Sequence, residues 1–270
     1  PGFAALRAEC LLLATWDDHD YGQDDAGAEY ARKRESQEVF NDFFEVPSDS
    51  PRRARPGVYD AVVLGPPDAR VQVILLDTRS FRSPLRSWPE DERPPGRGPY
   101  RPHEPDDGAP TLLGEAQWRW LADELRRPAE VRIVASSIQV IADEHGWESW
   151  GNFPSERRRL FELIAACGAT GVLFVSGDRH LAEIARLDPA ESGVGYPLHD
   201  VTSSSLNKPT KKDVSGEPNR HRLGANYPAE NFGSIEIDWS AADPVIELSI
   251  QSLSGDPVES LTLRLDELEP

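Results

Sequence analysis

Blocks of apolar residues alternate with polar segments along this chain, and their spacing predicts a mixed α/β fold. Apolar residues recur at helical spacing over 28–46, 115–127 and 154–167, each bounded by charged residues, glycine or proline. Short apolar or alternating runs predict strands at 10–16, 58–64, 71–76, 131–141, 171–176, 181–187, 199–202, 233–239, 245–253 and 258–265. Helices and strands alternate first and strands dominate later, which indicates sheets flanked by helices.

Two segments of this pattern have a more specific interpretation. The turn signal Gly65-Pro66-Pro67-Asp68 separates two of the expected strands, which predicts a hairpin over 58–76. Residues 83–110 are rich in proline, glycine and arginine and nearly lack aliphatic residues, so we expect a long loop inserted at the surface.

Composition narrows the choice of partners. The formal net charge is -18, which disfavours binding to nucleic acid or to an anionic lipid surface. No apolar stretch is long enough to span a bilayer. The cysteines, Cys10 and Cys167, do not make a disulfide framework, and we expect two buried free thiols.

Polar clusters follow several of the expected strands where each strand ends. They are Asp17-Asp18-His19-Asp20, Asp77-Thr78-Arg79, Ser136-Ser137-Ile138-Gln139 and Gly177-Asp178-Arg179-His180. If the strands are neighbours, these clusters share one edge of a sheet, where open α/β sheets bind ligands. Asp and His together are suitable metal ligands. The alternatives are a solvated acidic turn for the first cluster and an ordinary Gly-Asp turn for the last.

The same motifs resemble the PhoD-like (alkaline phosphatase D) metallophosphatases of the calcineurin-like superfamily. The resemblance is carried, in order, by residues 16–22 (WDDHDYG), 75–82 (LLDTRSFR), 114–118 (GEAQW), 136–139 (SSIQ), 152–157 (NFPSER) and 176–180 (SGDRH). It implies that residues 1–270 form a four-layer αββα sandwich of β-sheets flanked by helices.

The resemblance also implies residue roles. Asp18, Asp178 and His180 match metal ligands, His19 matches the catalytic imidazole, and Asp17 and Asp20 orient the ligands. Arg79, Arg82 and Arg179 are candidates for binding phosphate oxygens, with surface ion pairs as the alternative. The basic segment 206–224 either extends over the site or is a solvated loop.

The implied activity is hydrolysis of phosphomonoesters or phosphodiesters of small molecules. Hydroxide bound between two or more metal ions would attack phosphorus, and the family suggests calcium and iron. His19 would donate a proton to the leaving oxygen or hold the equatorial oxygens of the phosphate. The family also suggests a periplasmic or extracellular location.

The chain departs from the family pattern at its start. Asp-x-His and Gly-Asp blocks that supply further metal ligands do not occur before Trp16, and the chain begins with Pro1 and contains no methionine. We therefore expect that N-terminal strands are missing, that a sheet edge is left destabilised and that this chain alone has little or no activity. The alternative is a non-catalytic binding protein that retains the fold without a complete binuclear site.

Overall fold

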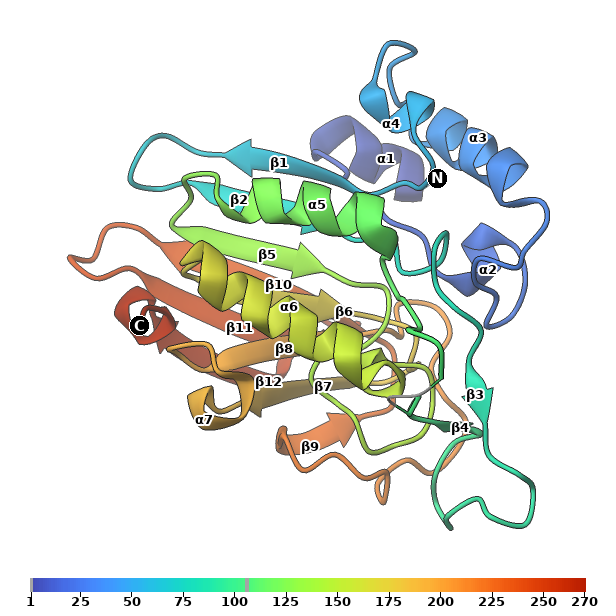
Figure 1. Cartoon of the computed structure of the whole chain (residues 1–270). Helices are drawn as coiled ribbons and strands as arrows, with labels where there is room; N and C mark the ends of the chain where they lie inside the picture. Colours follow the sequence, from blue (N-terminus) through green and yellow to red (C-terminus); the bar gives the residue numbers. More distant parts are fainter. Residues whose placement is uncertain (1, 105–106) are drawn as a thin grey trace.

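A seven-stranded mixed sheet forms the centre of the computed structural model, which describes residues 2–104 and 107–270 (Figure 1). Its strands lie in the order β1-β2-β5-β6-β8-β7-β9. They are β1 (Asp60–Leu64), β2 (Val71–Leu75), β5 (Val131–Ala135), β6 (Val172–Ser176), β7 (Ala182–Leu187), β8 (Leu198–Ser203) and β9 (Arg222–Tyr227). Strands β2, β5, β6 and β8 are parallel, so their carboxyl ends lie at one edge.

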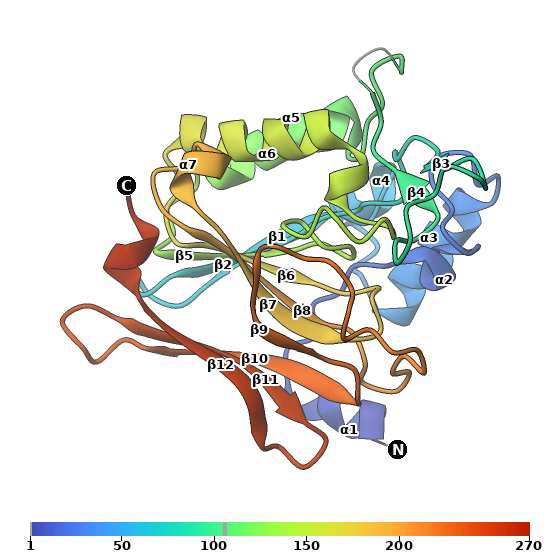
Figure 2. The same cartoon turned by 90° about the horizontal axis from the view of Figure 1, so that it is seen from below.

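Two long helices, α5 (Gly114–Leu125) and α6 (Pro154–Cys167), cover one face of this sheet (Figure 2). Trp118, Leu121 and Leu125 recur at helical spacing on α5 and are buried against the sheet. Helix α6 begins at a proline and ends at Gly168, whose positive φ of 60° is readily adopted by glycine.

A second, three-stranded sheet packs on the opposite face. It contains β10 (Asn231–Asp238), β11 (Val245–Ser252) and β12 (Pro257–Arg264) in that order. Ile246, Leu248 and Ile250 alternate along β11 and join the same core as the helices. The mixed α/β class and the sheets flanked by helices are thus confirmed. We expected four layers, and the described residues form three of them, namely the helices, the large sheet and the small sheet (Figure 2).

Apart from α3, the remaining elements are short. They are α1 (Gly2–Glu9), α2 (Asp18–Tyr21), α3 (Lys33–Phe43), α4 (Pro51–Ala54), α7 (Pro189–Ser192), the 3-10 turns Trp150–Asn152 and Leu265–Leu268, and the two-stranded pair β3 (Arg86–Ser87) and β4 (Tyr100–Arg101). The last pair lies in the predicted surface segment 83–110, of which residues 105–106 lie outside the described part. No helix among the described residues is long and apolar enough to cross a membrane.

Several predicted elements need correction. The apolar run 10–16 is an extended segment without strand pairing, and Leu11 is 66% exposed. Cys10 is exposed and Cys167 only partly buried, so the thiols are not both buried. The strand expected over 131–141 ends at Ala135, because Val140 and Ile141 donate their backbone N–H groups to the Asp200 carboxylate instead of to a strand. Strand β9 lies partly in the segment interpreted as a loop.

Candidate active site

Trp16 fixes the first acidic cluster to the edge of the large sheet. Its side chain is fully buried and packs edge-on against Tyr21 and Phe40. The indole Nε1 donates a hydrogen bond of 2.9 Å to Oδ1 of Asp77, directly after β2. The hydroxyl of Thr15 also donates to the Leu76 carbonyl, at 2.6 Å. The turn that follows Trp16 is therefore held at the carboxyl end of β2.

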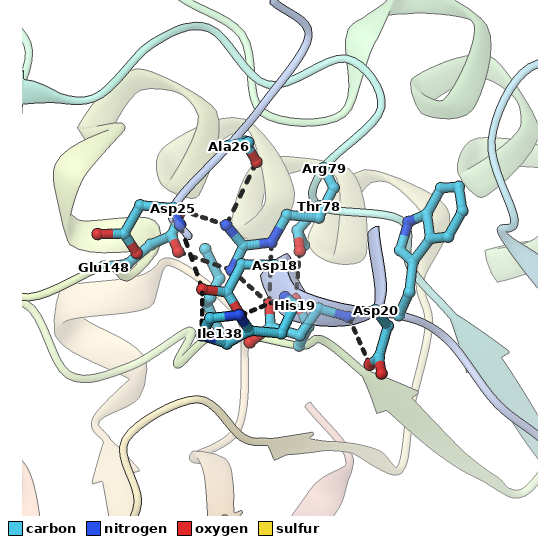
Figure 3. A network of polar contacts seen from close by, with 12 residues as sticks. Asp18, His19, Asp20, Asp25, Ala26, Thr78, Arg79, Ile138 and Glu148 are labelled. Carbon is cyan, nitrogen blue, oxygen red and sulfur yellow. Dashed lines mark hydrogen bonds and ion pairs between the residues drawn. The ribbon is translucent and has the colours of Figure 1, made fainter. Parts of the chain in front are cut away.

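That turn is the short helix α2, which displays the predicted ligands. Oδ1 of Asp18 accepts the backbone N–H of His19 at 2.7 Å, and Oδ2 accepts that of Asp25 at 3.2 Å. Asp20 accepts the backbone N–H of Asp17 at 3.4 Å. Asp18 is buried, whereas His19 and Asp20 are exposed. Asp20 thus holds the beginning of the helix and does not face the other carboxylates (Figure 3).

The second cluster follows β6 in an unusual backbone conformation. Gly177 donates its N–H to the Ser137 carbonyl at 3.1 Å, and a side chain on Gly177 would lie only 3.2 Å from that oxygen. Asp178 and His180 have positive φ values of 69° and 54°. This left-handed conformation is uncommon for residues other than glycine and occurs preferentially at functional sites.

The structure brings the two clusters together. Carboxylate oxygens of Asp17, Asp18 and Asp178 all lie within 4.8 Å of one another. Burial raises the pKa of Asp178 well above its ordinary value, and the charges of Asp17 and Glu148 raise it further. Burial also raises the pKa of Asp17, although Arg79 opposes that shift. Three crowded carboxylates of this kind are stabilised by a hard divalent cation, so the donor set fits a metal.

His19 forms a second group of possible metal ligands with Asp18 and Asp24, whereas the His180 imidazole belongs to neither group among the described residues. Nε2 of His19 lies 3.8 Å from Oδ2 of Asp18 and 3.4 Å from Oδ1 of Asp24, at the exposed side of the site. His180 donates its backbone N–H to Ser204 at 3.1 Å. Burial lowers the pKa of the His180 imidazole, Lys208 and Arg179 lower it further, and Asp18 opposes them. The neutral imidazole that metal ligation requires is therefore favoured.

The three candidate arginines are already paired. Arg79 and Arg82 are fully buried, and both contact the carboxylate of Glu148. Arg79 also bonds Asp17. The side chain of Arg179 is 9% exposed and pairs with Glu217. In this arrangement Arg79 and Arg82 lie behind the carboxylates and not on the surface that a substrate would meet.

The sequence did not single out Glu148, which the structure places at the centre of the buried charges. Burial raises its pKa to about 7, although Arg79 and Arg82 oppose the shift. The only signal in the sequence is an acidic residue between two tryptophans, Trp147 and Trp150.

The basic segment 206–224 reaches the site. The backbone N–H of Thr210 bonds the His180 carbonyl at 2.8 Å. Lys212 lies 4.9 Å from the ring centre of Trp147, and Arg179 lies 5.4 Å from the same ring. Positive charge is therefore supplied beside the carboxylates of an otherwise acidic protein.

Comparisons with known proteins agree with this architecture. The family model described as PhoD-like phosphatase matches residues 1–242. A solved structure of PhoD superposes with a TM-score of 0.64 at 16% sequence identity, a likeness that concerns the fold alone. The match covers 93% of this chain and 51% of that chain, so this chain spans about half the length of that protein. No curated protein matches the chain.

Proposed function

The chain belongs to the PhoD-like phosphatase family, and from this premise we propose that it hydrolyses phosphate esters of small molecules with the help of divalent cations. The observation that carries the proposal is the convergence of Asp17, Asp18 and Asp178 within 4.8 Å at the carboxyl edge of the parallel strands. A phosphomonoester or phosphodiester approaching this edge would meet cations and not bare carboxylates.

Asp18 and Asp178 would hold the cation, with His180 as a nitrogen ligand beside them. Asp17 lies in the same group, so we assign it to the ligand set as well. A bound cation supplies charge that balances the carboxylates, polarises phosphoryl oxygens and makes water more acidic. Oxygen ligands favour calcium, magnesium or manganese, and the adjacent imidazole also permits zinc or iron.

His19 is the candidate proton donor. It lies at the exposed side of Asp18, where the leaving group of a bound ester would emerge, and Asp18 and Asp24 orient its ring. An imidazolium at this position would protonate the leaving oxygen. Lys208 and Lys212 in the segment 206–224 would attract the anionic ester, since the arginines of the site are paired with carboxylates.

The test is hydrolysis of p-nitrophenyl phosphate and bis-p-nitrophenyl phosphate by the purified protein. Turnover that chelation abolishes and that added calcium or manganese restores would support the proposal. Asp18→Asn should abolish turnover, whereas Asp213→Asn, on the exposed part of the segment 206–224, should not. A folded protein that binds cations but hydrolyses neither ester would support the alternative, a non-catalytic binding protein.

A further inference from the structure

A buried ion pair lies directly behind the carboxylate cluster. The side chains of Arg79 and Glu148 are 0% and 1% exposed. Nη1 of Arg79 donates to Oε1 of Glu148 at 2.9 Å, and Nη2 lies 2.6 Å from Oε2. One hydrogen bond and one close ionic contact therefore hold the guanidinium group against Glu148. Glu148 therefore determines where the other edge of Arg79 points (Figure 3).

That other edge of Arg79 holds Asp17. Nε donates to Oδ1 of Asp17 at 2.9 Å, and Nη2 also donates to Oδ1. Oδ2 of Asp17 receives no hydrogen bond from Arg79. The backbone of Arg79 is itself fixed, because its N–H donates to Oδ1 of Asp77 at 2.9 Å. Arg79 has no freedom of its own, and together with a hydrogen bond from the Ser137 side chain it sets the direction of the Asp17 carboxylate.

A second buried arginine joins this group. Nε of the fully buried Arg82 lies 3.1 Å from Oε1 of Glu148, so two arginines face the carboxylates of Glu148 and Asp17. Loss of the Glu148 charge would leave one positive charge in excess behind the carboxylate cluster. That excess would draw Asp17 toward Arg79 and oppose the binding of a cation.

We propose that Glu148 and Arg79 are positioning residues, which direct the Asp17 carboxylate toward Asp18 and Asp178. They thereby set the cation affinity of the site, although Glu148 does not itself line it. The inference rests on the proposed function in that it takes Asp17 to face the bound cation. It extends that function by assigning a role to a residue outside the motifs that resemble the family.

The first experiment is a calorimetric calcium titration of the whole chain. Glu148→Gln keeps the shape of the side chain but removes its charge, and we expect an affinity about tenfold weaker. Glu148→Asp retains the charge and should recover part of the loss. The matched control is Glu156→Gln, because Glu156 is also buried but accepts hydrogen bonds from Trp118 and Leu112 instead. Unchanged affinity in Glu148→Gln, or an equal loss in the control, would overturn the proposal.

The second experiment uses no metal. Urea unfolding of Asp17→Asn, Glu148→Gln and the double variant tests whether these side chains are linked through Arg79. We expect the unfolding equilibrium constant of the double variant to depart at least about threefold from the product of the single effects. Independent effects would refute the link. If the wild-type protein binds neither calcium nor manganese, the proposed cation site fails, and this cycle still decides whether Glu148 positions Asp17.

Discussion

Replacing Asp178 by asparagine should make the metal-free protein more stable. Two unit charges no more than 4.8 Å apart repel each other by at least about 3.5 kcal/mol at an effective dielectric constant of about 20. Protonation relieves part of this repulsion, because burial and the charges of Asp17 and Glu148 raise the pKa of Asp178. Asparagine also tolerates the positive φ of 69°. We therefore expect Asp178→Asn to raise the free energy of unfolding by about 2 kcal/mol, after discounting for protonation.

With added cation, the wild-type protein should become more stable than Asp178→Asn. A ligand at 100 times its dissociation constant stabilises the folded state by about 2.7 kcal/mol. The wild-type protein should gain that amount and Asp178→Asn almost none, because the variant lacks a ligand. Urea unfolding with chelator and then with calcium or manganese measures both states.

A matched variant separates this effect from ordinary loss of a buried carboxylate. Asp200 is buried on β8 and accepts hydrogen bonds from Ser176 and from the backbone of Val140 and Ile141. Asp200→Asn should destabilise the protein by about 1–3 kcal/mol with or without cation. If Asp178→Asn also destabilises the metal-free protein, or if cation stabilises it as much as the wild type, the argument from carboxylate crowding is refuted.

Three further predictions concern other parts of the chain. Burial lowers the pKa of His199 from 6.5 to about 4, so the unfolded state takes up the proton at a higher pH than the folded state. The free energy of unfolding should therefore fall by up to about 3 kcal/mol as the pH is lowered from 6.5 to 4. In urea titrations, His199→Gln should flatten that pH profile. Trp16→Phe removes the hydrogen bond to Asp77, so it should lower the free energy of unfolding by about 1–3 kcal/mol and weaken calcium binding in calorimetry. Unchanged stability and calcium affinity would contradict the anchoring role of Trp16. Cys10 should react with a thiol reagent in the native protein faster than Cys167, and equal rates would contradict the exposure seen here.

The fold could be predicted where periodic pattern and packing agree. Helices α5 and α6 and the hairpin of β1 and β2 appear close to the expected bounds, because their apolar spacing matches the face that each buries. The apolar run 10–16 was wrongly interpreted as a buried strand, since a local pattern does not reveal whether a neighbouring strand is available for pairing. Strand β9 was missed because Arg222 and Asn226 give it a polar pattern.

The site could be predicted in part for a similar reason. Asp77 and Asp178 follow parallel strands and therefore lie at one edge. Asp17 and Asp18 follow no strand, and they reach Asp178 at that edge because Trp16 is hydrogen-bonded to Asp77. The partner of a buried arginine is a long-range property, and Glu148 lies 69 residues from Arg79 in the sequence. The sequence pattern therefore predicts a charged Arg79 near the site, but it does not predict that Arg79 forms a buried ion pair with Glu148.

The central claim is that a cation binds between Asp18 and Asp178 at the carboxyl edge of the parallel strands. Anomalous diffraction from crystals grown with manganese tests it most directly. We predict a strong anomalous peak within about 2.5 Å of oxygens of both carboxylates. Crystals that contain manganese elsewhere, or none at all, while these two carboxylates remain without a peak would contradict the claim.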